Sequence, residues 1–468
     1  MVFSSAVFLF CFLPVVFLLS RLPFGRRWQN ALLAAASLVF YAFGNLHYVP
    51  LFLASILINY CTGLLLGGRF KHSRTVLAVN VLLNLGILCV FKYTDFLIAN
   101  LNAVSGAHLH PVGLILPIGI SFFTFQGLSY TIDVYRRPEE YSRNFLKLLL
   151  YISFFPQLIA GPIVRWGDIS SQIDARTCTP EKTSAGIRRF IVGLSKKLLI
   201  ADAAAVVADA VFSAGIGDCR LAWLGGICYT LQIYFDFSGY SDMAIGMGKM
   251  FGFSIKENFL FPYTADSIRD FWRKWHISLS TWFREYLYIP LGGNRKGRSR
   301  ATLNRLIVFF CTGLWHGANW TFVLWGLGHG LLSSLEGSGV IPVERLQKSI
   351  PGRILCRIYT LLAVMLLFTL FRADSVAQGF GMIAAMFRFQ LLPEGSALLA
   401  RLSAPSASVI LCLALLLSLS ESGSRIHGWL TCEGKRELLP ALCCLLLFVL
   451  SVMSLAQSGF HPFIYFQF

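Results

Sequence analysis

The sequence has few charged residues and a marked shortage of acidic ones. Charged side chains make up 13% of its 468 residues, about half of the roughly 25% that soluble domains carry. Hydrophobic residues make up 56%, and a soluble chain of this length cannot bury so much apolar surface, so the excess must face lipid. These proportions exclude an ordinary soluble domain and predict an all-α polytopic membrane protein.

Several common signatures of chemistry are also missing. The 12 cysteines include no C-x-x-C pair, and the chain has no H-E-x-x-H, no G-x-S-x-G and no complete P-loop. We therefore expect no catalytic metal and no permanently bound cofactor. The net charge of +17 lies in short loops between apolar runs, which predicts membrane topology and excludes nucleic-acid binding.

The apolar runs predict about ten to twelve membrane crossings, because a spanning helix needs about 20 mainly apolar residues. Glycine and proline interrupt some runs, as in Leu116–Gly119 and Phe155–Pro162. Irregular backbone at membrane depth is tolerated where protein buries it or a cavity is present. These interruptions predict re-entrant segments around an internal cavity. The runs with spanning character are Phe3–Ser20, Ala31–Gly44, Pro50–Leu66, Val76–Phe91, Gly113–Tyr130, Leu146–Ala160, Phe190–Val211, Leu221–Phe235, Leu303–Leu332, Leu355–Phe371, Ala407–Leu419 and Leu438–Leu455.

Basic residues alternate between the loops. The Arg21–Arg27, Arg69–Arg74 and Arg136–Lys147 loops are basic, while the loops between them are nearly neutral. The positive-inside rule then places both termini outside the cytoplasm. The segment Arg269–Arg305 holds nine Lys or Arg and two acidic residues, which predicts the cytoplasmic face for it.

The segment Ser267–Tyr286 is predicted to form one amphipathic helix. A basic strip lies beside an aromatic stripe that includes Trp272 and Trp275. Two interpretations stay open: an interfacial anchor, or a platform for an anionic cofactor. The strip is formed by Arg269, Arg273, His276, Ser280 and Arg284.

A second polar element lies within the apolar run Leu303–Leu332. His316 and Asn319 lie there, where ionisable residues are costly and are candidates for function. His329 is a weaker candidate. It follows His316 by 13 residues, which on a straight helix means a rotation of about 220° and a rise of about 20 Å. The two histidines are therefore not expected to share a metal ion.

Two further features contain polar groups. The segment Asp236–Asp242 reads as a Gly/Ser turn between two apolar runs, and a structural role for its carboxylates is favoured over acid–base chemistry. The C-terminal tail, residues 461–468, is aromatic and typical of an interfacial anchor. Tyr465 is the strong nucleophile candidate in it.

Together these segments resemble the membrane-bound O-acyltransferase family, and most closely its bacterial branch of alginate (AlgI) and peptidoglycan (PatA) O-acetylation proteins. The resemblance rests on Asp236–Asp242, Phe271–Ser280, Tyr288–Asn294 and Trp315–Trp320. It implies a single domain, residues 1–468, built as a helical bundle around a transmembrane funnel. The catalytic segment would cover about 232–330.

The resemblance also implies roles for particular residues. His316 matches the near-universal histidine of the family, and His276 matches a polar position that is Asn in many eukaryotic relatives. Tyr465 becomes a candidate acyl carrier, and His329 stays a secondary candidate. The residues expected to bind the donor are Arg269, Arg273, Lys274, Trp275 and Asn319.

In this branch the acetyl donor is expected to be cytoplasmic acetyl-CoA. The acetyl group would cross the bacterial inner membrane to an extracytoplasmic acetyltransferase of the SGNH-hydrolase type, which modifies an envelope polysaccharide. The main alternative is a transporter or flippase for an acyl group or a lipid-linked sugar, without covalent catalysis. An acyltransferase for lysophospholipids or proteins, and a scaffold with structural histidines, are further alternatives.

Overall fold

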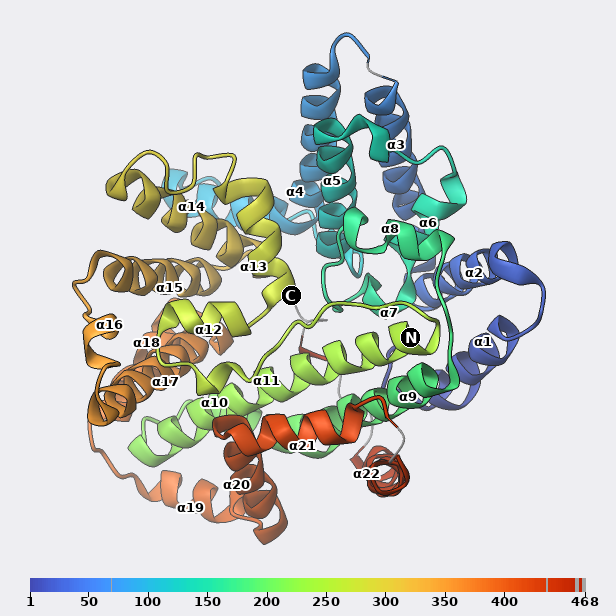
Figure 1. Ribbon diagram of the computed structural model, residues 1–468. Coiled ribbons are helices and arrows are strands. Elements are labelled where there is room, and N and C mark those ends of the chain that lie inside the picture. Colours follow the sequence, from blue (N-terminus) through green and yellow to red (C-terminus); the bar gives the residue numbers. More distant parts are fainter. Residues whose placement is uncertain (69, 435–436, 459–462, 465–468) are drawn as a thin grey trace. The chain divides into compact units, whose positions relative to one another are not determined.

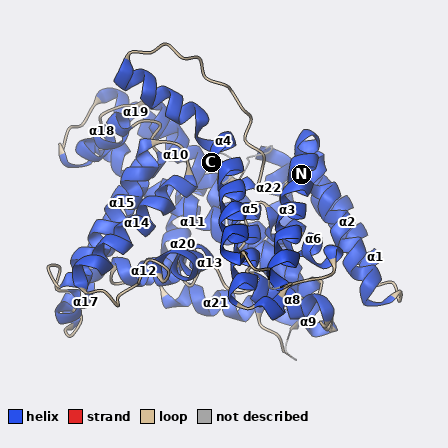
Figure 2. Ribbon diagram, turned by 90° about the horizontal axis from the view of Figure 1, so that it is seen from above, coloured by secondary structure: helices blue, strands red, loops and turns tan. Residues whose placement is uncertain are grey.

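The structure is a computed structural model that describes residues 1–68, 70–434, 437–458 and 463–464. Helices joined by loops account for the described fold, and no strand occurs within these ranges (Figure 2). The predicted all-α class is thereby confirmed. Contacts divide the chain into two compact units, one of residues 1–190 and 241–256, the other of residues 191–240 and 257–468.

The first unit is built from the N-terminal helices (Figure 1). Both predicted breaks fall in this unit. At the first, α5 begins after Gly119, whose φ of +77° is a left-handed conformation that glycine adopts without strain. Its elements are η1 Phe8–Phe12, α1 Leu13–Ser20, α2 Gly25–Asn45, η2 Leu46–Tyr48, α3 Val49–Gly67, α4 Ser73–Ser105, α5 Ile120–Arg136, η3 Pro138–Glu140, α6 Phe145–Ser153, α7 Phe155–Leu158, α8 Trp166–Asp174 and most of α9 Pro180–Ser195.

The second unit contains all of the described candidate site residues. Its helix α11 extends beyond the unit into residues of the first. Its elements are η4 Lys196–Ala201, α10 Asp202–Ala214, α11 Cys219–Met250, η5 Pro262–Thr264, α12 Ile268–Lys274, α13 Ile277–Phe283, η6 Arg284–Tyr288, α14 Arg298–His316, α15 Trp320–Ser338, α16 Val343–Leu346, α17 Ile350–Arg372, α18 Val376–Phe387, α19 Pro393–Leu402, α20 Pro405–Leu419, α21 Glu421–Thr431 and α22 Leu438–Ser458.

Four described segments are long and apolar enough to cross a membrane, which supports a multi-pass membrane protein. A fifth crossing is possible if α19 and α20, bent by 84°, form one broken span. The larger number of ten to twelve crossings stays a prediction. The four segments are Gly25–Gly67, Ser73–Ser105, Ile350–Arg372 and Leu438–Gln457.

The run Leu303–Leu332 is a helical hairpin, so the prediction of one span there is wrong. Helix α14 ends at His316, and α15 begins at Trp320 and returns beside it (Figure 1). A Cβ at Gly313 or Gly326 would collide with the backbone of the partner helix. Glycine at both positions therefore allows the two helices to pack at close range.

The prediction of a turn at Asp236–Asp242 is also wrong, because the segment lies inside the continuous helix α11. Its carboxylates are buried and ion-paired instead of capping a turn: Asp236 with Lys197 at 2.8 Å, and Asp242 with Arg189 at 2.8 Å. Pairing compensates the cost of burying these charges within a helix. Their structural role, as expected, is to hold neighbouring helices.

Candidate active site

The predicted helix over Ser267–Tyr286 is broken in the structure. Helix α12 ends at Lys274, α13 begins at Ile277, and His276 between them has φ 43° and ψ 54°. Asn258 causes the break: its carbonyl oxygen accepts the N–H of Ile277 at 3.0 Å. A partner distant in sequence thus satisfies the start of α13, which helical periodicity could not reveal.

The break places His276 in the interior, with its side chain fully buried. Its Nδ1 lies 3.2 Å from Oδ1 of Asn258, an oxygen that also accepts both the backbone N–H and the hydroxyl of Ser278. Because that amide oxygen only accepts, Nδ1 of His276 must donate. This assigns the proton of the neutral ring to Nδ1 and leaves the lone pair on Nε2.

His316 lies at the C-terminal end of α14 and is 3% exposed. Aromatic rings surround it: Trp315 at 5.0 Å, Trp325 at 5.0 Å and Phe371 at 5.2 Å between centroids. The Trp315 ring also lies 5.8 Å from His276. The structure therefore brings the two predicted histidines to one indole ring, in a single aromatic cluster.

His329 belongs to the same cluster through Trp325, which lies 5.0 Å from His316 and 5.2 Å from His329. The straight helix assumed for this pair is wrong, because the chain turns back between α14 and α15. His329 is fully buried and stacks on Phe271 at 6.0 Å. Neither of its ring nitrogens has a hydrogen-bond partner among the residues that the structure describes.

The three basic residues predicted to bind the donor lie on α12, and two of them have acidic neighbours. Lys274 pairs with Asp270 at 2.7 Å, and Arg269 approaches Glu344 at 3.5 Å. Arg273 is exposed and makes no ion pair with any described residue, so of these three cations it is the most available to an anionic ligand.

The other two residues predicted to bind the donor, Trp275 and Asn319, have structural contacts. Trp275 is 1% exposed and stacks on Phe271. Asn319 caps α15: its side chain accepts the N–H of Thr321 at 3.0 Å and donates to the carbonyl oxygen of Asp374 at 3.1 Å.

A cavity of about 160 Å³ lies beside the histidine cluster. Ser280 and Thr312 reach it, each one helical turn from a site histidine. The cavity borders the cluster through Trp272 and Phe309, whose rings lie 5.2 and 6.4 Å from that of His329. Its walls are Trp272, Leu279, Ser280, Phe283, Arg284, Tyr288, Val308, Phe309 and Thr312.

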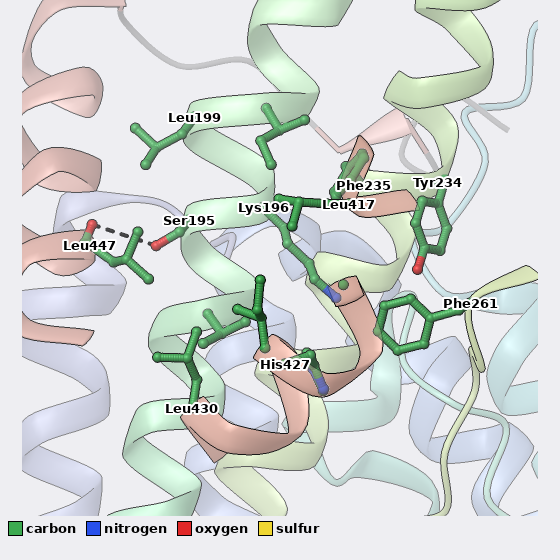
Figure 3. Close-up of a pocket in the computed structure, with 14 residues that line it drawn as sticks. Ser195, Lys196, Leu199, Tyr234, Phe235, Phe261, Leu417, His427, Leu430 and Leu447 are labelled. Atoms are coloured by element: carbon green, nitrogen blue, oxygen red, sulfur yellow. Dashed lines mark hydrogen bonds between the residues drawn. The ribbon is translucent and has the colours of Figure 1, made fainter. Parts of the chain in front are cut away.

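A second cavity of about 240 Å³ lies elsewhere in this unit, and no predicted site residue lines it. Figure 3 shows the side chains of Lys196 and His427 between apolar walls that include Phe261 and Leu417. Lys196 directly precedes Lys197, which the described ion pairs join to Asp236.

Tyr465, the predicted acyl carrier, lies outside the described residues. The two residues before it, Phe463 and Ile464, are described and buried, at 1% and 4% exposure. This burial does not fit an interfacial anchor at these two positions.

Sequence reasoning missed the residues that support the site. Asn258 sits in a polar loop without any motif, and Glu336 lies 68 positions from the helix it caps, with its carboxylate accepting the N–H of Ile268 at 2.7 Å. A negative charge at the start of α12 is favourable because the helix dipole is positive there. The sequence offered one signal for these residues, which is that Glu336 is an acidic residue near the end of an apolar run.

A protein-family model described as MBOAT, membrane-bound O-acyltransferase family, matches residues 134–340 of the sequence. This range includes the three histidines of the cluster. A protein described as "Probable alginate O-acetylase AlgI" from Pseudomonas putida is 41% identical over 491 aligned positions that cover 100% of both chains. The chain belongs to the membrane-bound O-acyltransferase family.

Other relatives of this MBOAT protein act on different polymers by name. A "Peptidoglycan O-acetyltransferase" of Helicobacter pylori is 37% identical over 82% of this chain and 80% of its own. A "Teichoic acid D-alanyltransferase" of Bacillus subtilis is 27% identical over 48% of this chain and 60% of its own. The MBOAT protein is thus a multi-pass membrane enzyme, an O-acyltransferase of the acetyltransferase type.

Proposed function

We propose that this enzyme takes an acetyl group from cytoplasmic acetyl-CoA and moves it across the bacterial inner membrane for O-acetylation of an envelope polysaccharide. The observation that carries the proposal is the burial of His276 and His316 around Trp315, within the region that matches the family. The names of the full-length relatives favour alginate or a similar polymer as the final acceptor.

The proposed step breaks the thioester bond and forms an ester. A hydroxyl oxygen attacks the acetyl carbonyl, His316 takes the hydroxyl proton, and the coenzyme A thiolate leaves and is then protonated. His276 in the tautomer with Nδ1–H offers Nε2 as an acceptor, which suits orienting a donor N–H better than polarising the carbonyl.

A different group is then needed to stabilise the developing oxyanion. The indole N–H of Trp325 is buried and has no partner among described residues, and its ring lies 5.0 Å from His316. A buried donor of this kind stabilises negative charge that develops in the transition state. We assign the oxyanion contact to Trp325.

The donor is proposed to approach through the 160 Å³ cavity. Its phosphates carry negative charge, and Arg273 is the exposed cation of α12, while Arg269 and Lys274 are partly neutralised by acidic neighbours. The basic Arg269–Arg305 segment is predicted to face the cytoplasm, where coenzyme A is available.

The acetyl group is proposed to leave on the far side of the membrane. Tyr465 would accept it as a phenyl ester and pass it to an extracytoplasmic acetyltransferase of the SGNH-hydrolase type. Both termini are proposed to lie outside, following the alternation of basic loops. This topology would place the tail on the same side as the polymer.

His316→Ala tests the proposal. The variant should insert normally and lose acetyl transfer by a factor of about 10² or more, the size typical of a removed acid–base group. The measurement is polymer acetylation in cells and release of coenzyme A by the purified protein. His427→Ala, in the second cavity, is the matched control and should remain active. Full acetyl transfer by a well-expressed His316→Ala protein would contradict the proposed enzyme mechanism and favour a transporter.

A further inference from the structure

A buried charge cluster joins η4, α10 and α11 in the second unit. The ammonium of Lys197 is 3% exposed and lies 2.7 Å from Asp202 and 2.8 Å from Asp236. Two buried carboxylates thus share one ammonium inside the protein. Such a cluster is costly unless the remaining lone pairs find hydrogen-bond donors.

The C-terminal segment supplies one of these donors. The backbone N–H of Ile464 donates to Oδ2 of Asp236 at 2.7 Å, while Oδ1 of the same carboxylate faces Lys197. Asp236 therefore uses one oxygen for the charge cluster and the other for the chain end.

The ring of Phe463 strengthens the same attachment. It packs edge-on against Tyr240 at 4.8 Å between centroids, and the Lys197 ammonium lies 4.8 Å from its centroid on the ring face. Asp236 and Tyr240 are four residues apart, so they share one face of α11. Residues 463 and 464 are thus held by ion–ring, ring–ring and hydrogen-bond contacts.

The neighbouring residue on α11 contacts the histidine cluster. Phe237 lies 4.6 Å from His276, with the two rings nearly perpendicular at 88°. The same turn of α11 therefore supports His276 through Phe237 and the chain end through Asp236. The distance between the tail attachment and the site is set by one rigid helix.

We propose that Asp236 and Lys197 are positioning residues that hold residues 463–464 against the turn of α11 that contacts the catalytic site at His276. The proposal rests on the proposed function for the location of that site. The carboxylate aligns the chain end through Ile464, and the ammonium both neutralises Asp236 and holds Phe463. Acetyl transfer then requires an attached tail.

Carboxypeptidase digestion of the full-length purified protein, followed by intact mass measurement, tests the attachment. In the wild type, removal of C-terminal residues should stop before Ile464. Asp236→Ala should allow digestion past Phe463 and lower polymer acetylation at least tenfold. Asp242→Ala is the matched control, because it breaks another buried ion pair of α11, the one with Arg189. Its tail should stay protected.

Phe463→Ala guards against a folding defect, because it loosens the segment without leaving a buried charge unpaired. It should also expose the tail and reduce acetylation. A tail that stays protected in both Asp236→Ala and Phe463→Ala, or full acetylation with a released tail, overturns the inference.

The carrier role of Tyr465 can be tested separately from the attachment of the tail. If Tyr465→Phe acetylates polymer normally while Asp236→Ala releases the tail and loses activity, the attachment stands and the relay does not. If His316→Ala remains active, the location of the site is wrong, whatever the digestion shows.

Discussion

At the scale of single residues, the site is a set of buried polar atoms in an aromatic environment. Ionisable side chains are costly to bury in an apolar environment, so their presence there favours a catalytic use. His316 was predictable because a histidine within an apolar run stands out. Asn258 and Trp325 were not, since nothing in the sequence marks a loop amide that fixes a tautomer or an indole that lacks an acceptor.

Trp325→Phe tests the oxyanion contact. The substitution keeps a ring between His316 and His329 but removes the N–H, so kcat should fall by about 10²–10³ with little change in KM for the donor. Steady-state coenzyme A release measures both constants.

Trp272→Phe is the matched control, because its indole nitrogen is also buried without a described partner but its ring contacts His329. Equal losses in the two variants would mean that packing, and not the Trp325 N–H, matters.

At the scale of elements, long-range caps and close contacts decide where helices begin and end. Periodicity located the polar strip of Ser267–Tyr286 but could not show that Asn258 and Glu336 satisfy the starts of α13 and α12. The hairpin of α14 and α15 was missed for a related reason. A run of spanning length with a short glycine-containing break reads as one helix when only hydropathy is considered.

Gly326→Ala tests the close packing of this hairpin. The added Cβ would meet the carbonyl oxygen of Phe309, so the helices must separate at a cost of about 1–3 kcal/mol. Thermal unfolding in detergent should show a lower midpoint, and activity should fall because Trp325 is the adjacent residue.

Gly381→Ala provides the comparison, since a Cβ at that position in α18 meets nothing within 4 Å. This control should be neutral or stabilising by about 0.5–1 kcal/mol. A Gly326→Ala protein as stable as Gly381→Ala would show that the hairpin tolerates separation.

At the scale of the whole molecule, composition alone predicted a helical membrane protein. With only 13% charged residues, the chain must place its excess apolar surface against lipid. The pairing of distant segments was beyond such reasoning. Asp218, in the loop between α10 and α11, illustrates it: its carboxylate accepts the N–H of Leu392 at 2.7 Å and pairs with Arg220 at 2.9 Å. One buried acid thus connects segments 174 positions apart.

Acid should weaken this connection. Arg220 holds the pKa of Asp218 well below its usual range, so the folded protein binds that proton less readily than the unfolded chain. The stabilisation is complete above the unfolded pKa of about 3.9 and is lost as pH falls below it.

Asp218→Asn should therefore lower the unfolding midpoint at pH 7, by the equivalent of about 1.5–3 kcal/mol for a lost charged hydrogen bond. The difference from wild type should shrink below pH 4. Glu421→Gln, in an exposed pair with Arg425, should change little at either pH. A constant gap between wild type and Asp218→Asn from pH 7 to pH 3 would contradict the role of its charge.

The left-handed backbone at position 276 restricts which amino acids evolution can place there. With φ at 43°, β-branched residues are strained, while Gly, Asn, Asp and His are tolerated. Only some of these offer a neutral side chain that can both reach Asn258 and accept a proton or hydrogen bond on its other side. Histidine and asparagine both tolerate this backbone conformation and provide the hydrogen-bonding groups. We therefore expect exchange between these two amino acids to be the substitution that this fold permits at position 276.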